Sequence, residues 1–329
     1  MDSTYNLAAE PQGEDDLAEV REIGQKNFNT ARHGGFLIHH AMSLLIAAAL
    51  LLVAPAQSQT KGASEYIGKL FIQRQFVSGS HPVYDAEGNP LSGTAGPWTT
   101  CAEIVVREIH ESGESLFIEG SRMLLLYDRQ NRQFRDIFDV LNSPSEAQRL
   151  FTSLPKDEQL EELRKEQAVT IEIRRAGIWD ADAIAAAMHK VFLSQGEHLS
   201  DFATPAWKNF LCKSEKAADA TSQCAFTGQH RTSIPFRVGG GVSAPRARYT
   251  PDPQYAEQAR RARYQGQTVL WLVVDRDGNA NEVSIALPVG LGLDEKAVAA
   301  VSQWKFDPAI KDREPVNVQI NVEVNFRLY

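Results

Sequence analysis

Cysteine, positive charge and long hydrophobic runs are all scarce in this sequence. Its three cysteines in 329 residues exclude a scaffold held together by many disulfides. Its 34 lysines and arginines stand against 42 acidic residues, which gives a net charge of −8. Without a basic surplus to neutralise phosphates, the sequence predicts no nucleic-acid partner. The 43% hydrophobic and 23% charged residues are typical of globular domains, and the length suggests about two of them.

Motifs for catalysis and metal binding are also missing. The chain has no His-Glu-x-x-His, Cys-x-x-Cys or Gly-x-Ser-x-Gly pattern. Residues 239–241 are three glycines without the Lys-Ser/Thr of a phosphate loop, and we interpret them as a flexible linker. Residues 275–279 resemble a calcium loop only faintly and are predicted to form a hairpin turn. We therefore predict no catalytic residue, no metal site and no cofactor, and we do not expect an enzyme.

One hydrophobic run, residues 36–54, is just long enough to cross a bilayer. Two interpretations stay open: a retained single-pass anchor, or a signal segment within residues 36–56 that is cleaved after an Ala-Pro-Ala pattern. Arg32 precedes the run and no base follows it before Lys61, which favours a cytoplasmic N-terminus. In either case residues after about 57 lie outside the cytoplasm. Residues 1–35 are polar and acidic, and we predict a disordered cytoplasmic tail.

Two of the cysteines lie close together in a polar stretch. Cys212 and Cys224 either close a short surface loop through a disulfide or remain two unrelated thiols. Cys101 precedes an apolar run and is predicted to be a core residue.

The middle of the chain mixes strand and helix signals. After a polar linker at residues 57–64, residues 65–212 are predicted to form an α+β domain of unknown role. Residues 213–241 are predicted to be a second linker. The expected strands are 66–76, 102–109, 115–127 and 168–173, and the expected helices are 143–167, 180–192 and 199–211.

The pattern is sharpest from residue 242 to residue 329. It predicts a helix at 255–264, strands at 267–275 and 281–287, a helix at 293–304 and a final strand at 316–328. The order helix–β–β–helix–β predicts a three-stranded antiparallel sheet packed on two helices. In the final strand apolar and polar residues alternate strictly, which is typical of a half-buried strand. Its outer edge is open to the addition of another strand.

Residues 242–329 resemble the C-terminal domain of the TonB family of energy transducers. The resemblance is carried by several spaced motifs in the same order. They are Pro253-x-Tyr255, Tyr264-Gln265-Gly266-x-x-Val269, Val274-Asp275-x-Asp277-Gly278, Gly292-Leu293-Asp294-x-x-Ala297, Trp304-Lys305-Phe306-x-Pro308-Ala309, and Pro315-Val316 through Val324-x-Phe326.

The resemblance implies a protein that is anchored in the inner membrane through residues 36–54, with the rest of the chain in the periplasm. It implies coupling of the proton-motive force, through an inner-membrane proton-driven motor complex, to an outer-membrane TonB-dependent receptor. A short receptor segment then adds as a strand to the C-terminal sheet. The residues implied in receptor binding are Pro253, Gln254, Tyr255, Val316, Val318, Ile320, Val322, Val324 and Phe326.

Three features differ from the family pattern. Ala256 follows Tyr255 where proline is usual, and a folded middle domain replaces a proline-rich spacer. In the hydrophobic run His39 precedes Ser43, the reverse of the usual order; His39, His40 and Ser43 are the candidates for motor coupling. A second interpretation therefore stays open, a periplasmic binding or scaffolding protein that uses the domain without the motor. Exposed edge strands also allow a homodimer.

Overall fold

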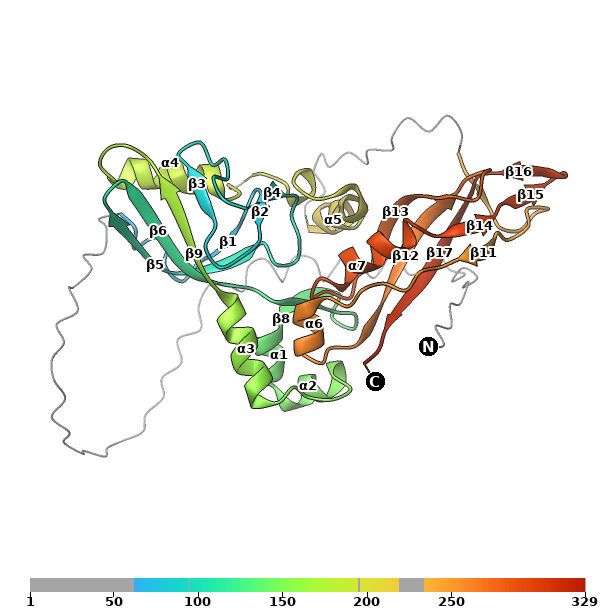
Figure 1. The fold of residues 1–329 in the computed structure, drawn as a ribbon, viewed down its shortest axis with the longest axis horizontal. Coiled ribbons are helices and arrows are strands. Elements are labelled where there is room, and N and C mark those ends of the chain that lie inside the picture. The colour runs from blue at the N-terminus through green and yellow to red at the C-terminus, as the bar shows by residue number, and fades with distance from the viewer. Residues whose placement is uncertain (1–61, 94, 195, 219–233, 329) are drawn as a thin grey trace.

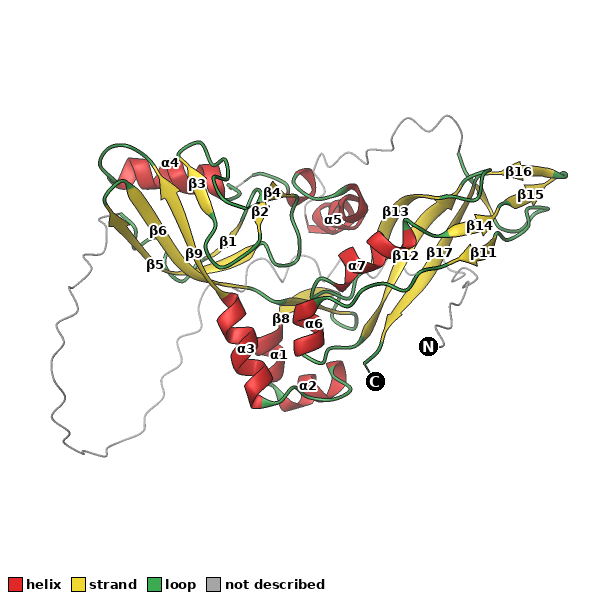
Figure 2. Cartoon of the chain, in the orientation of Figure 1, coloured by secondary structure: helices red, strands yellow, loops and turns green. Residues whose placement is uncertain are grey.

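The computed structural model describes residues 62–93, 95–194, 196–218 and 234–328 (Figure 1). The predicted tail and the hydrophobic run, with His39, His40 and Ser43, lie outside these residues, and so does Cys224. Within the described ranges no helix is both long and apolar enough to span a membrane. The described chain is mixed α+β, with a five-stranded sheet in the middle region, a four-stranded sheet at the C-terminal end and several two-stranded ribbons (Figure 2).

The middle region is built on a five-stranded sheet in the order β1-β5-β6-β9-β3. Neighbouring strands are antiparallel except for the parallel pair β3–β9. Every second residue of β6 is buried, as expected for a strand with one face on a core. The strands are β1 (Leu70–Ile72), β3 (Val83–Asp85), β5 (Glu103–Ser112), β6 (Ser115–Arg122) and β9 (Ala168–Arg174).

One helix, α4 (Ala181–Val191), packs on this sheet. As predicted, the helix begins at an aspartate: Oδ1 of Asp180 accepts a 2.8 Å hydrogen bond from the backbone N–H of Ala183. Its buried face includes Ile184 and Met188, which join the apolar residues of the sheet in one core. Two short strands, β2 (Phe76–Val77) and β4 (Ala95–Gly96), pair beside it.

An insertion between β6 and β9 departs from the sequence prediction. The strand predicted at 115–127 is two strands, because the chain leaves the sheet after Arg122 and enters a separate hairpin. The helix predicted at 143–167 is also divided, and Pro155 lies in the gap, where it disfavours helix for the residue before it. The insertion contains β7 (Leu125–Asp128), β8 (Gln133–Asp136), α1 (Ile137–Leu141), α2 (Pro144–Leu150) and α3 (Asp157–Gln167).

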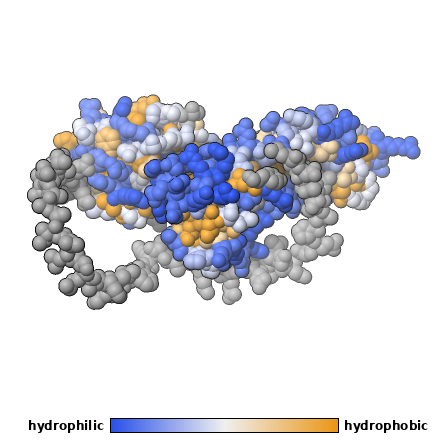
Figure 3. Space-filling model, turned by 60° about the horizontal axis from the view of Figure 1, so that its bottom comes forward, coloured by the Kyte–Doolittle hydropathy of each residue, from blue (hydrophilic) through white to orange (hydrophobic). Residues whose placement is uncertain are grey.

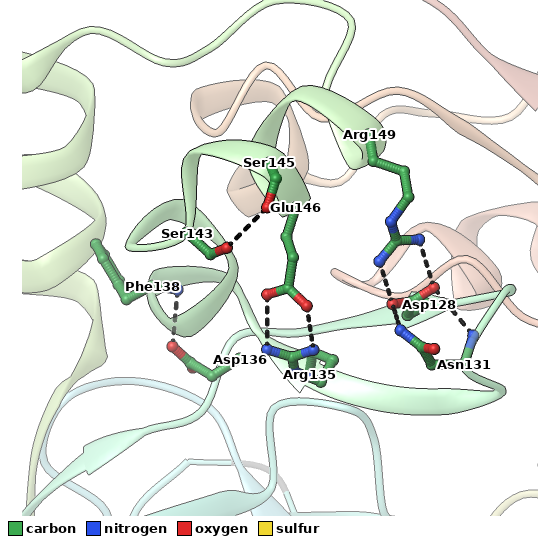
Figure 4. A network of polar contacts seen from close by, with 9 residues as sticks. All are labelled: Asp128, Asn131, Arg135, Asp136, Phe138, Ser143, Ser145, Glu146 and Arg149. Atoms are coloured by element: carbon green, nitrogen blue, oxygen red, sulfur yellow. Dashed lines mark hydrogen bonds and ion pairs between the residues drawn. The ribbon is translucent and has the colours of Figure 1, made fainter.

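Ion pairs fasten α2 to this hairpin (Figure 4). Arg149 donates to both carboxylate oxygens of Asp128, at 2.8 and 2.5 Å, and Arg135 donates to both oxygens of Glu146, at 3.0 Å each. Asn131 Nδ2 donates a further 2.7 Å hydrogen bond to Asp128. These donors, with Arg149 foremost, hold the pKa of the Asp128 carboxyl well below its usual value. The hairpin and α2 therefore behave as one unit.

The C-terminal sheet has four strands in the order β10-β17-β12-β13. Its three long strands form the predicted antiparallel sheet: β12 (Gly266–Val274), β13 (Ala280–Leu287) and β17 (Val318–Phe326). The fourth, β10 (Phe236–Arg237), was not predicted; it is parallel to β17 and lies in the segment expected to be a linker. The helices are α6 (Glu257–Arg261) and α7 (Leu293–Val301), and two ribbons extend the domain: β11 (Arg246–Tyr249) with β14 (Lys305–Asp307), and β15 (Ala309–Lys311) with β16 (Glu314–Val316).

The middle region and the C-terminal sheet share a hydrophobic core. The backbone N–H of Tyr127 donates to the carbonyl of Val289 at 2.9 Å, and that of Leu291 donates to the carbonyl of Leu125 at 2.7 Å. Between them Gly290 has a φ of +94°, and a Cβ there would lie 2.5 Å from the Leu125 carbonyl oxygen. Glycine is therefore required where the hairpin and the loop meet.

A helix that follows the middle region packs beside the β13 edge of the C-terminal sheet. A 3-10 turn, η3 (Leu199–Asp201), and α5 (Pro205–Ala218) occupy the region predicted as helix 199–211, and α5 extends into the expected linker. It lies against β13 (Figure 1). Cys212 is fully buried in α5 and is disulfide-bonded. Because Cys224 lies outside the described residues, the predicted Cys212–Cys224 pairing stays a prediction, whereas Cys101 is a free, buried thiol as expected.

Candidate strand-addition site

The last long strand, β17, has two unequal edges. On one side all nine of its residues pair with β12 without a register shift, from Val318 opposite Val274 to Phe326 opposite Gly266. On the other side β10 pairs with Val318 and Gln319 only. No other strand in the described part of the chain pairs with residues 320–326 on that side.

Hydrogen-bond alternation decides which residues of β17 face this second side. The backbone N–H of Phe236 donates to the carbonyl of Asn317 at 2.8 Å, so the Asn317 carbonyl points toward β10. In a regular strand the peptide groups of alternate residues point to opposite sides. The N–H and C=O groups of Asn321, Glu323 and Asn325 therefore face away from β12. We call these groups the open edge of β17.

Side chains of the even-numbered residues of β17 are not available to a partner. Val318, Ile320, Val322, Val324 and Phe326 are all buried, with at most 7% of their surface exposed. Their backbone groups face β12, and their side chains fill the core under α6 and α7. These predicted receptor-binding positions build the strand, whereas the odd-numbered residues between them carry the open edge.

Val316 belongs to a different element from the strand in which it was predicted. It pairs with Ala309 in the β15–β16 ribbon, and Asn317, which is assigned to neither strand, separates this ribbon from β17. Its side chain is buried. Sequence alternation runs unbroken through residues 316–328 and therefore does not reveal this break.

Tyr255 lies at the Phe326 end of β17. Its hydroxyl donates a 2.6 Å hydrogen bond to the carbonyl of Tyr264, and its ring meets the Phe326 ring edge-on, with centroids 5.6 Å apart. Burial raises the pKa of Tyr255 to about 12, so the hydroxyl keeps its proton. Nearby, Trp304 donates to the Pro251 carbonyl at 3.3 Å, which fixes the segment that carries Tyr255. Within that segment Pro253 is partly exposed and Gln254 is exposed.

A buried acid holds the loop between β13 and α7. The helix α7 begins after Gly292, and Asp294 lies in its first turn. It accepts hydrogen bonds from Thr268 Oγ1 at 2.7 Å and from the backbone N–H groups of Val289 and Gly290 at 3.0 and 2.7 Å. Burial raises the pKa of Asp294 to about 7. The loop that meets the middle region is thereby fixed from within.

The opposite edge of the sheet is occupied by the middle region. Trp207 of α5 donates from its indole nitrogen to Oε1 of Glu295 at 3.0 Å, and α5 lies against β13. On the face shown in Figure 3, hydrophobic residues form separate small groups among hydrophilic ones.

Comparison with known proteins agrees with this architecture. Residues 251–328 match the family model described as the Gram-negative bacterial TonB protein C-terminal. The chain is a TonB C-terminal domain protein. The match covers β12, β13, α6, α7 and β17, so the open edge belongs to the TonB C-terminal domain.

Relatives are similar to this TonB C-terminal domain over part of their length. Protein TonB of Vibrio cholerae serotype O1 is 32% identical over 77 residues, which cover 23% of this chain and 32% of that protein. Protein TonB of Xanthomonas campestris pv. campestris strain B100 is 32% identical over 92 residues, 28% of this chain and 41% of that protein. The solution NMR structure of the Pseudomonas aeruginosa TonB CTD is 16% identical, with a TM-score of 0.24, over 29% of this chain and 96% of that one. The chain thus spans less than half of the length of these curated relatives.

Two features of the site escaped sequence analysis. The strand β10 has only two residues, and its signal is the alternation of Ile234, Phe236 and Val238 just before three glycines. The docking of α5 depends on Trp207 and Glu295, which are 88 positions apart in the chain and share no local pattern.

Proposed function

We propose that this protein is a TonB-like adaptor that couples the inner-membrane proton-motive force to outer-membrane β-barrel receptors. A receptor segment adds as a strand to the open edge of β17. The motor complex acts through the N-terminal run, where His39, His40 and Ser43 stay the candidates for coupling. The proposal places the chain in the cell envelope, with residues after about 57 in the periplasm.

The observation that carries this proposal is the pairing of β17. An intrachain strand already lies on the same side of β17 as the open edge, so this side accepts a strand in the folded protein. The opposite edge strand, β13, packs against α5. Backbone hydrogen bonds accept many side-chain sequences, which suits an adaptor that serves several receptors.

The middle region supports a variant of this function. It packs on the TonB C-terminal domain through the β7–β8 hairpin and α5, where a flexible spacer would leave the domain free. This favours, as a second candidate, a periplasmic scaffolding protein without motor coupling. The mature N-terminus, read by mass spectrometry on membrane-derived protein, separates the two. Retention of residues 36–54 supports the adaptor, and a chain that begins at Gln57 supports the scaffold.

Strand addition is tested with one backbone substitution. Asn321→Pro removes an N–H that faces the open edge, where proline is compatible with a strand. Asn321→Ala keeps this N–H and is the matched control. The probe is a set of fluorescent ten-residue peptides that copy the N-terminal segments of the organism's own outer-membrane receptors. Binding to the full chain in detergent is measured by anisotropy.

We expect Asn321→Pro to weaken peptide binding about tenfold, the equivalent of one hydrogen bond, and Asn321→Ala to change it little. Thermal unfolding shows whether the proline variant is folded. As a second measurement, peptides N-methylated at alternate positions lose donors without any change in the protein. Equal binding of the proline variant and of every N-methylated peptide would rule out strand addition at this edge.

A further inference from the structure

The chain places one of its own segments on the edge that the proposed function assigns to a receptor. Phe236 lies opposite Val318 and Arg237 opposite Gln319, in parallel register. The backbone N–H of Phe236 donates to Asn317 at 2.8 Å. A partner strand that paired with all of β17 would need the positions that β10 occupies. The intrachain strand and a full-length partner strand therefore exclude each other at residues 318 and 319.

The sequence on both sides of β10 limits it to this short stretch. By alternation, the backbone nitrogen of Pro235 points away from β17. Proline has no N–H there, and β10 therefore loses no hydrogen bond to β17. The same missing donor leaves the outside of β10 a poor template for a further strand. On the other side, residues 239–241 turn the chain away before β10 can continue along the open edge.

The apolar side chains of this segment add little to its hold on β17. Ile234, Phe236 and Val238 are 87%, 40% and 48% exposed, so the segment buries little apolar surface. The Phe236 ring is covered on one side by the ammonium of Lys311, 4.4 Å from the ring centroid. A segment with few apolar contacts and only two paired residues separates from β17 at a small cost in free energy.

A glycine hinge ties the segment to the domain. Gly239, Gly240 and Gly241 all have positive φ, and a Cβ on any of them would meet no atom within 4 Å. The next residue, Val242, is buried in the shared core and anchors the chain beyond the hinge. Released residues 234–238 therefore remain close to β17, at a high effective concentration.

We propose that residues 234–238 are a built-in competitor for the receptor-binding edge of β17, which a receptor segment displaces when it binds. This inference rests on the proposed function, because it regulates the same edge. The competitor sets a threshold: short or weakly pairing segments leave it in place, and a segment that pairs along the whole strand removes it. It also shields part of an edge strand from unspecific pairing when no receptor is bound.

The test compares three forms of the full chain with the same labelled receptor peptides. The released form is Phe236→Pro, which removes the N–H that bonds to Asn317. Its matched control is Arg237→Pro, because by alternation this N–H faces away from β17. Arg237→Ala accounts for the loss of the arginine side chain, which both Arg237 substitutions remove. The locked form carries Arg237→Cys and Gln319→Cys. These positions are paired in register, at a separation of about 5 Å that a disulfide can bridge. Each single cysteine variant, treated with the same oxidant and reductant, controls for Cys101 and Cys212.

We expect the released form to bind the peptides about three- to tenfold more tightly than the unaltered chain, and the control to bind within about twofold of it. The locked form should bind at least about tenfold more weakly, and reduction should restore its affinity. If the released, unaltered and locked forms bind the peptides with equal affinity, residues 234–238 are not a competitor, and the proposal of receptor binding at β17 is unaffected. If even the released form binds no peptide, the proposed function falls, and the competitor falls with it.

Discussion

A hydrogen bond between Trp207 and Glu295 is one of the contacts that join the two halves of this protein. The indole nitrogen of Trp207, on α5, lies 3.0 Å from Oε1 of Glu295, on α7. Oε2 of Glu295 is buried and has no hydrogen-bond partner within the described residues. Burial, the largest cause, raises the pKa of Glu295. The contact with Trp207 therefore offsets part of the cost of taking this acid out of water, after the hydrogen bond to the backbone of Glu295 itself.

The first prediction concerns this contact. Trp207→Phe removes the donor but keeps an aromatic ring, and we expect the free energy of unfolding to fall by about 2 kcal/mol. Glu295→Gln in the same background should recover part of this loss, since a neutral amide is less costly to bury. A double-mutant cycle by urea denaturation should give a coupling energy of about 1–2 kcal/mol. Additive effects of the two substitutions would show that the contact does not stabilise the junction.

The second prediction is a pH dependence. The pKa of Asp294 is raised by burial from 3.8 to about 7, so the folded protein keeps a proton that the unfolded chain releases. The free energy of unfolding should therefore fall as the pH rises from about 4 to about 7. Asp294→Asn removes the titration and should make this decline shallower by about 1.4 kcal/mol per pH unit.

Denaturation curves at several pH values measure the effect of Asp294→Asn. The pKa of Glu295 is also raised, and burial raises the pKa of Glu103 to about 7, so part of the decline persists in the variant. Asp182→Asn, on α4, is the control. A slope that is the same in the unaltered chain and in Asp294→Asn would contradict the assignment.

The third prediction tests the close approach at the junction. Gly290→Ala combines a φ of +94° with a Cβ placed 2.5 Å from the Leu125 carbonyl oxygen. We expect it to destabilise the protein by about 2–4 kcal/mol. Gly113→Ala has a φ of +62° and no atom within 4 Å, so it isolates the backbone cost, about 1 kcal/mol. Thermal unfolding of both variants separates the cost of the Cβ clash from the cost of the backbone conformation. Equal losses of stability would show that the hairpin does not approach this loop closely enough to exclude a Cβ.

The fourth prediction compares an ion pair between α2 and the β7–β8 hairpin with one on the surface of α3. Asp128 is buried and accepts from Arg149, whereas Glu162 and Lys165 pair on an exposed helix face. Arg149→Ala leaves a carboxylate without its main partner, and we expect a loss of about 1–2 kcal/mol because the arginine is partly screened by solvent. Lys165→Ala should cost less than about 0.5 kcal/mol.

The Asp128 pair also has a pH signature. Because the pKa of Asp128 is lowered in the folded protein, the stability that Arg149 supplies should disappear as the pH falls below about 4. Urea midpoints of the unaltered chain and of Arg149→Ala should therefore converge in acid. Midpoints that keep their separation at low pH would contradict this account.

Much of the C-terminal domain could be predicted from the sequence because its signals are local. The alternation predicted at residues 316–328 and the helical spacing predicted at 293–304 each reflect one buried face of one element, and the structure ends these elements at Phe326 and Val301. The middle region was harder: the strand predicted to end at Tyr127 is divided, since Leu124 N–H donates to Oδ2 of Asp136 at 2.9 Å in a separate hairpin. That contact joins residues with no shared periodicity.

The candidate site shows the same limit. The sequence marked the apolar residues of the last strand, such as Val322, because apolar side chains define a strand by their burial. A strand edge, however, is made of peptide groups that every residue carries, so composition does not distinguish Asn321 from Val322 in this respect. The hydrogen bond from Phe236 to Asn317 shows that the peptide groups of Asn321, and not those of Val322, point toward the open edge.

By itself the sequence determined the family resemblance and the antiparallel pairing of β12, β13 and β17, because both depend on local spacing and hydrophobicity. Only the tertiary structure decided that α5 lies against β13 and that β10 lies on β17. The reason is physical: pairing between segments that are distant in the chain depends on the geometry of both partners, and a sequence pattern describes one segment at a time.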